Sequence, residues 1–156
     1  MTPAQRRMTA LAAAVAIAMP AEGLRRVAYR DPVGIATTCW GSTTAVEFGR
    51  TYTMDECRAR LDADMNEALD IVDRCAPGLP WPVLAAFGDA VFNMGGKIAC
   101  NLKESTAARL LKARDLRGAC DQLLRWNKAR VAGVMVTLPG LTKRREKERE
   151  LCLTGV

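Results

Sequence analysis

Residues 22–43 read EGLRRVAYRDPVGIATTCWGST, and this stretch decides how the first part of the chain folds. It opens with the carboxylate of Glu22, directly after an uncharged segment, and continues with β-branched residues interrupted by turn formers such as Pro32 and Gly34. Short Thr- and Val-rich runs separated by proline and glycine are typical of small antiparallel sheets with tight turns. We therefore predict a short antiparallel sheet within residues 24–52.

After residue 52 the sequence has the regular apolar spacing of helices instead of frequent proline and glycine residues. Thr53 and Glu56 have the spacing of a capping box, in which each side chain satisfies a free backbone N–H at the start of a helix. Apolar residues then recur at steps of three and four residues: Met54, Cys57, Leu61, Met65, Leu69 and Val72. This periodicity predicts one long helix over residues 53–74.

The rest of the chain also has helical character. Pro82 suits the first turn of a helix, and Gly95 with Gly96 suits the left-handed turn that ends one. Further helices are predicted over residues 105–113, over residues 115–128, and from the turn at Pro139-Gly140 to about Leu153.

These elements predict an α+β protein with a divided architecture. An apolar N-terminal helix occupies residues 1–21, and the main domain occupies residues 22–156. Within that domain we expect a small N-terminal lobe with the short antiparallel sheet, a connecting helix, and a larger all-helical lobe. Their approximate bounds are 22–52, 53–74 and 79–156.

Composition restricts the chemistry. The chain has 156 residues and no histidine, which excludes Ser-His-Asp hydrolases, Cys-His peptidases and zinc sites that need imidazole. The net charge of +6 favours an anionic partner, such as nucleic acid, a membrane surface or an acidic wall polymer. Because there are only three Trp, two Tyr and three Phe, a base-stacking surface for nucleic acid is poorly supplied. Carboxylate chemistry remains, and we expect no metal, no cofactor and no nucleic-acid partner.

The six cysteines allow two interpretations. They lie at positions 39, 57, 75, 100, 120 and 152, and no two have the spacing of a CxxC motif. An even number spread along the chain fits up to three disulfides in an oxidising compartment, in any of 15 pairings. The alternative is that several are small buried apolar residues in a reducing cytosol.

The N-terminal segment has the character of an export signal. Arg6 and Arg7 precede an uncharged, alanine-rich stretch over residues 8–21, which is shorter than the roughly 20 residues of a membrane span. It fits a cleaved signal peptide, and the alternative is an amphipathic or buried helix that never meets a membrane.

Motifs along most of the chain resemble one known family. Glu22, Asp31 and Thr37 follow the spacing Glu-x8-Asp-x5-Thr. Around them stand Gly23, Ala28, Tyr29, Gly34, Cys39, Gly41 and Thr43, and further on Phe92-Asn93-Met94-Gly95-Gly96, Trp126 and Gly140-Leu141-x-x-Arg144-Arg145-x-x-Glu148. From about residue 20 onward this order is similar to the phage-type lysozymes, the T-even-like muramidases of glycoside hydrolase family twenty-four.

The resemblance implies a lysozyme-like fold and an endolysin activity. Such an enzyme hydrolyses the β-1,4 bond between N-acetylmuramic acid and N-acetylglucosamine in peptidoglycan and causes host cell lysis. The catalytic residues would be Glu22, Asp31 and Thr37, and Asn93 and Gly95 would bind substrate along the cleft. We expect a monomer whose partner is peptidoglycan.

The residue types of the triad suit this reaction. Glycoside hydrolysis needs a proton donor for the departing oxygen and an activated water on the opposite face of the sugar. Partial burial at a helix end would favour the protonated form of Glu22. Asp31, in a turn before Pro32, is expected to stay ionised and to hold the attacking water together with the Thr37 hydroxyl. The resemblance then implies inversion at the anomeric carbon.

Two other functions remain open on the sequence. A lytic transglycosylase of lysozyme-like fold would use Glu22 alone and would not need Asp31 and Thr37. The chain could also be a cationic protein that binds the wall or membrane without catalysis, in which case the triad spacing would be a coincidence. The presence of all three triad residues favours the hydrolase.

The triad also bears on the N-terminal segment. Cleavage by signal peptidase near residue 21 would damage the helix that carries Glu22. The arrangement resembles the signal-anchor-release endolysins, which implies transient association with the inner membrane through residues 8–21, followed by release into the host periplasm. Alanine-rich segments of this length are held weakly in a bilayer.

Three smaller features lead to further expectations. Cys39 stands where the family often has glycine, which suggests a disulfide near the active site with an unknown partner. Trp126 is expected in the core rather than in contact with sugar. The charged run over residues 143–150, KRREKERE, is expected to form a salt-bridged, solvated helix face.

Overall fold

The computed structural model describes residues 1–156, and the chain begins with a long helix that packs into the fold. This helix, α1, spans Pro3–Glu22 and starts with a capping box between Thr2 and Gln5. Its buried face consists of small residues, Ala10, Ala14, Val15 and Ala18, so its backbone can approach α2, α3 and α7 closely. No helix has both the length and the hydropathy of a membrane-spanning segment.

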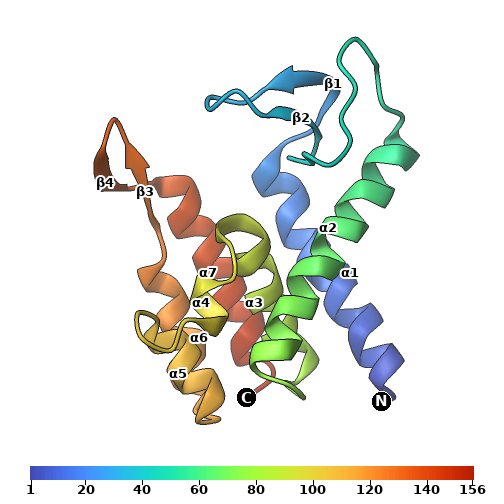
Figure 1. The fold of residues 1–156 in the computed structure, drawn as a ribbon. Coiled ribbons are helices and arrows are strands. Elements are labelled where there is room, and N and C mark those ends of the chain that lie inside the picture. The colour runs from blue at the N-terminus through green and yellow to red at the C-terminus, as the bar shows by residue number, and fades with distance from the viewer.

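The predicted sheet is present as a hairpin. Strands β1 (Arg25–Arg30) and β2 (Ala36–Cys39) pair antiparallel, with Tyr29 opposite Thr37. A single bridge between Val27 and Thr51 brings the following loop back to β1. In Figure 1 the hairpin projects at the end of the molecule opposite to both chain termini.

The long helix predicted over residues 53–74 is confirmed as α2, Met54–Cys75. The Thr53 hydroxyl accepts the backbone N–H of Glu56, which is one half of the expected capping box. The six apolar positions of the predicted stripe include five buried residues, while Met54 is exposed.

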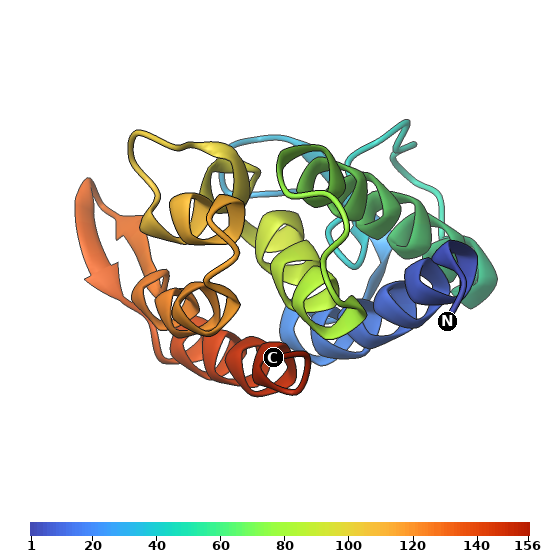
Figure 2. The same ribbon diagram turned by 90° about the horizontal axis from the view of Figure 1, so that it is seen from below.

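A buried helix, α3 (Trp81–Met94), forms the centre of the helical part. Figure 2 shows α3 surrounded by α1, α2, α7 and the short helices. All residues from Pro82 to Val91 are buried. One contact shows how closely α2 approaches α3: a Cβ on Gly88 would lie 2.3 Å from Leu69 Cδ2, so a larger residue there would require Leu69 to move.

The C-terminal half differs in part from the sequence prediction. Its helices are α4 (Lys97–Cys100), α5 (Thr106–Lys112), α6 (Leu116–Gln122), the 3-10 turn η1 (Leu123–Arg125) and α7 (Pro139–Leu153). The predicted helix over residues 115–128 was therefore too long. Strands β3 (Lys128–Val131) and β4 (Val134–Thr137) form a second hairpin that the prediction missed. Pro139 and Gly140 begin α7 instead of forming a turn before it.

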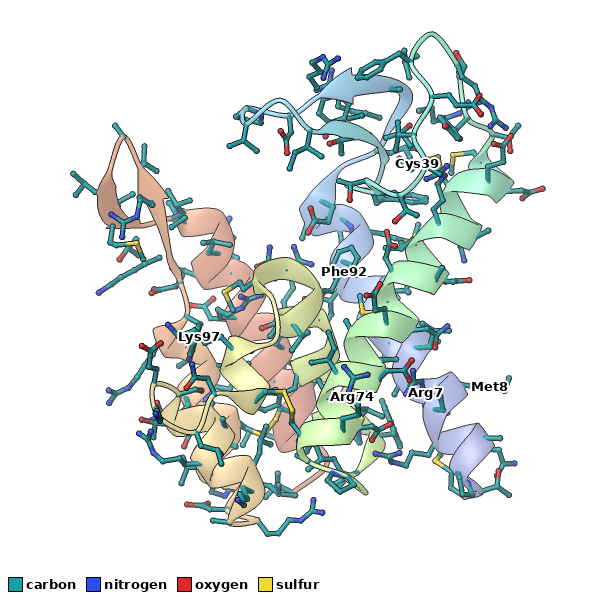
Figure 3. All side chains as sticks on the ribbon, viewed as in Figure 1. Arg7, Met8, Cys39, Arg74, Phe92 and Lys97 are labelled. Carbon is teal, nitrogen blue, oxygen red and sulfur yellow. A yellow bond between two sulfur atoms is a disulfide. The ribbon has the colours of Figure 1, made fainter.

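All six cysteines form disulfides, which decides the alternative that the sequence left open. The pairs are Cys39–Cys57, Cys75–Cys100 and Cys120–Cys152. They tie β2 to α2, α2 to α4, and α6 to α7. Figure 3 shows Cys39 and its disulfide at the upper end of α2.

Candidate active site

A cleft of about 420 Å³ is lined by the end of α1, the segment that follows β2, the middle of α2 and the end of α3. This volume falls in the range of ordinary small-molecule sites. The lining includes Glu22 of α1, Gly41 and Thr43 after β2, Asp64 and Glu67 of α2, and Phe92, Asn93 and Gly95 at the end of α3. Figure 3 shows Phe92 near the end of α3, at the side of the helical part that faces the hairpin.

Glu22 is the last residue of α1, and its side chain is 24% exposed in the cleft. The chain leaves the helix at Gly23, whose φ of +69° suits glycine. Gly41 lies close to the carboxylate, because a Cβ there would be 3.7 Å from Glu22 Oε2. The other oxygen, Oε1, accepts a hydrogen bond of 2.7 Å from Arg144 Nη1.

The Arg144 contact differs from the expectation for Glu22. That expectation considered burial alone, whereas the structure places a guanidinium at hydrogen-bond distance from the carboxylate. Arg144 is itself held by Asp89, through bonds of 2.9 Å from Nε to Oδ2 and 2.8 Å from Nη2 to Oδ1. Burial on its own would lower the pKa of Arg144, but Asp89 and then Glu22 raise it overall.

The expectation for residues 143–150 was wrong. Arg144, Arg145 and Glu148 are buried, and only the other side of α7 is solvated. Arg145 Nη2 donates to Glu148 Oε1 at 2.5 Å. Burial raises the pKa of Glu148 well above its ordinary value, and its contact with Asp89 adds to the shift, while Arg145 acts in the opposite direction. The alternating positive and negative residues of this helix therefore belong in part to a buried ion-pair network and not only to a solvated face.

Asp31 lies at the turn of the β1–β2 hairpin. Its Oδ1 accepts the backbone N–H groups of Val33 at 3.0 Å and of Ile35 at 2.8 Å. These bonds fix the position of the carboxylate within the turn.

Thr37 lies on β2 and is only 4% exposed. Its hydroxyl donates to the carbonyl oxygen of Ile35 at 2.9 Å, which leaves the oxygen lone pairs as acceptors. The lining of the cleft that contains Glu22, Asn93 and Gly95 does not include Asp31 or Thr37.

Asn93 and Gly95, which were predicted to bind substrate, both line the cleft. The Asn93 Oδ1 atom is buried and has no hydrogen-bond partner. Gly95 ends α3 with a φ of +89°. A buried acceptor without a partner beside a cleft is suited to a donor on a ligand.

Two acidic residues of the cleft were missed from the sequence. Asp64 and Glu67 lie on α2 and face the same cavity as Glu22. Burial raises the pKa of Asp64, repulsion by Glu67 adds to this, and Arg60 lowers it. The sequence did contain one sign of this: Asp64 and Glu67 are three residues apart on a predicted helix, which places both on the same face.

Comparison with known proteins gives one consistent result. The sequence profile of the family described as phage lysozyme matches residues 19–148. The SAR-endolysin of Bacteriophage PS119 is 39% identical over 136 residues, which cover 86% of this chain and 77% of the relative. The SAR-endolysin of Enterobacteria phage P21 is 38% identical over 136 residues, covering 86% of this chain and 78% of that relative.

Solved structures agree with the sequence relatives. The active form of the P1 phage endolysin Lyz superposes with a TM-score of 0.79 at 28% identity, covering 92% of this chain and 84% of that one. The secreted inactive form of the same endolysin gives a TM-score of 0.60 at 24% identity, covering 92% of this chain and 94% of that one.

Proposed function

Because the chain belongs to the phage lysozyme family and is a peptidoglycan-hydrolysing endolysin, we propose that Glu22 is its proton donor, with Asp31 and Thr37 on the water side. The bond hydrolysed is the β-1,4 linkage between N-acetylmuramic acid and N-acetylglucosamine. The observation that carries the assignment of Glu22 is its position in the cleft beside Asn93, with one oxygen held by Arg144 and the other facing Gly41.

The proton transfer follows from this geometry. Glu22 Oε2 is the oxygen not bonded to Arg144, so it is the atom that delivers a proton to the departing glycosidic oxygen. Arg144 then stabilises the carboxylate that remains after the transfer. A guanidinium hydrogen bond to a charge that develops during the reaction lowers the barrier.

Asp31 and Thr37 act on the attacking water. Two backbone N–H groups hold the Asp31 carboxylate in place, and this carboxylate accepts a proton from the attacking water. The free lone pairs of the Thr37 hydroxyl orient that water, and attack from the face opposite to Glu22 inverts the anomeric carbon. The motif spacing supports these roles.

Asn93 and Gly95 bind the glycan. The unpartnered Asn93 Oδ1 suits the N–H of an N-acetyl group, of which this substrate has one on every sugar. Gly95 has no side chain, so the substrate backbone can lie close to the end of α3.

The enzyme acts in the host periplasm after transient attachment to the inner membrane through residues 8–21. Relatives named SAR-endolysins and the three disulfides support this location. The higher TM-score with the active P1 endolysin supports the docked α1 as the arrangement of the released enzyme.

We propose a monomer that does not bind nucleic acid. Fractionation of the host before lysis should place the chain at the inner membrane, and recovery from the cytosol alone with six free thiols would contradict the proposal.

Digestion of purified Gram-negative peptidoglycan, with products read by mass spectrometry, tests the chemistry. The wild-type enzyme should release new reducing-end N-acetylmuramic acid, and Glu22→Gln should release none. Anhydro ends would instead identify a lytic transglycosylase. Inversion is tested by NMR of the first anomer formed, and Asp31→Asn and Thr37→Ala should each lose most turnover while keeping the fold.

A further inference from the structure

Asp89 lies directly behind the guanidinium that holds Glu22. It is fully buried on α3, and both of its oxygens accept hydrogen bonds from Arg144. A two-point contact between a carboxylate and a guanidinium fixes the plane of the guanidinium. The remaining nitrogen, Nη1, is thereby aimed at Glu22 Oε1 at 2.7 Å.

The charges of this network constrain where a proton resides. Glu22, Asp89 and Glu148 are three carboxyl groups in contact with only two guanidiniums, Arg144 and Arg145. Groups coupled this closely titrate together, and a surplus of carboxyl groups lets the cluster hold one proton more readily than two balanced pairs would. Burial and the contact with Asp89 raise the pKa of Glu148, so the surplus proton resides on Glu148. Asp89 shares the Arg144 guanidinium with Glu22, the member that reaches the cleft.

Other charged groups also face Glu22. Asp64 and Glu67 line the same cleft from α2, and Lys143 and Lys147 line an adjoining cavity on the exposed side of α7. Neither lysine makes an ion pair with Glu22, whereas Arg144 does. Asp89 is the acid that is linked to Glu22 through a shared guanidinium.

We propose that Asp89 is a positioning residue of the hydrolysis: it orients Arg144 and, by sharing the charge of that guanidinium, lets Glu22 keep the proton it must donate. This inference rests on the proposed role of Glu22. Without the Asp89 charge, Glu22 is the carboxyl group nearest to Arg144, at 2.7 Å against 4.0 Å for Glu148, and the proton donor is held in its ionised, inactive form.

The test is the dependence of the hydrolysis rate on pH, measured with the full-length oxidised enzyme on purified peptidoglycan from about pH 4 to about pH 9. In Asp89→Asn the alkaline limb of the profile should move to lower pH by about one unit, with a loss of rate on the order of tenfold near neutrality. The matched control is Asp121→Asn, which removes the α6 aspartate of an exposed pair with Arg149 of α7 and should leave the profile unchanged.

A second variant keeps the test decisive if Asp89→Asn does not fold. A buried guanidinium without its partner is strongly destabilising, and the double variant Asp89→Asn with Arg144→Gln removes that charge. The alkaline limb of its profile should return to the pH of the wild-type limb or move to higher pH. An alkaline limb at lower pH than in the wild type would overturn the proposal.

Two further outcomes would also overturn it. The first is an Asp89→Asn enzyme that melts at a lower temperature but keeps the wild-type profile, because that is a purely structural role. The second is an equal shift in the Asp121→Asn control. Glu22→Gln, measured in parallel, separates the two proposals: if it hydrolyses peptidoglycan, the assignment of Glu22 fails, whereas if it is inactive and Asp89→Asn is normal, only the role of Asp89 fails.

Discussion

At the scale of single residues, Gly41 shows how closely the backbone approaches the proton donor. Its φ is +80°, a conformation that side chains other than glycine adopt with strain. A Cβ at this position would lie 3.7 Å from Glu22 Oε2, in the space where the sugar oxygen must arrive. Gly49 has nearly the same φ, +79°, but a Cβ there would have no atom within 4 Å. A comparison of alanine variants at the two positions therefore distinguishes the effect of backbone strain, which both share, from obstruction of the cleft, which only Gly41 can cause.

We expect Gly41→Ala and Gly49→Ala to lose similar stability, about 1 kcal/mol each, since both force a left-handed conformation on alanine. Only Gly41→Ala should lose turnover, on the order of tenfold, because its methyl group displaces substrate from Glu22. Thermal melting and initial rates on peptidoglycan measure the two effects. Equal rates in both variants would show that the space beside Glu22 is not used.

Glu148 gives a prediction about stability and pH. Its pKa in the folded protein is raised above the ordinary value of 4.5, so its stabilising contribution is present below that value and is lost as pH rises through the folded-state pKa. Relative to the wild type, Glu148→Gln should therefore gain stability as pH increases. Denaturant unfolding at about pH 5 and about pH 8 measures this difference. Glu150→Gln, on the exposed side of the same helix, is the control and should show no such trend.

At the scale of elements, the disulfide Cys39–Cys57 joins β2 to the first turns of α2 next to the cleft. Trp40 and Gly41, which line the cleft, follow Cys39 directly. Cys120–Cys152 joins α6 to α7 without contributing to that lining. Both bonds stabilise the fold by limiting the unfolded chain, but only the first also holds cleft residues.

Replacing Cys39 and Cys57 by serine should cost about 3 kcal/mol of stability and should also reduce turnover at temperatures where the protein stays folded. Replacing Cys120 and Cys152 should cost a similar amount and leave turnover unchanged under those conditions. The measurements are thermal melting and the rate well below the melting temperature. Loss of turnover in both pairs alike would mean that the first disulfide has no local effect on the cleft.

At the scale of the whole molecule, α1 is held at its N-terminal end by ion pairs with α2. Arg7 donates to Asp70 at 2.6 Å and to Asp73 at 3.1 Å, and Arg6 donates to Asp73 at 2.8 Å. Figure 3 shows Arg7 on α1 beside α2. The pairs are partly exposed, so each contributes only modestly, but α1 carries Glu22 at its other end and its docking decides whether the cleft is complete.

Asp73→Asn should weaken this docking by about 1 kcal/mol, which corresponds to roughly fivefold faster hydrogen exchange of the α1 amides. Turnover should fall on warming before the rest of the fold melts. Asp62→Asn, on the same helix and in no ion pair with α1, is the control. Uniform acceleration of exchange across all helices would show that α1 does not open separately.

The sequence predicted the parts of the fold that short-range patterns encode. The α2 helix followed from the Thr53 cap and its apolar stripe, and the β1–β2 hairpin from Pro32 and Gly34. The β3–β4 hairpin was missed because its turn is Ala132-Gly133, with φ of +49° and +82°, and alanine gives no turn signal there.

The charged network could not be predicted in the same way. Arg144 meets Asp89 and Glu22 across 55 and 122 residues of chain, and helical spacing alone gives the same pattern for a solvated face. One signal was present: Asp89 is a lone charge within the apolar run of α3, and a buried carboxylate needs a cationic partner. The motifs alone led us to group Glu22, Asn93 and Gly95 in one site. The burial of Thr37 and the turn contacts of Asp31 depend on the geometry of the folded hairpin, which the motifs do not describe.

The order of the disulfides along the chain has a consequence for how the protein matures. Each cysteine is bonded to its neighbour in sequence, so the three loops close one after another without interleaving. A chain that emerges N-terminus first into an oxidising compartment presents the second cysteine of each pair before the next pair appears. Joining each newly exposed thiol to the one still free therefore yields the native set, out of 15 possible pairings, without any later reshuffling by an isomerase.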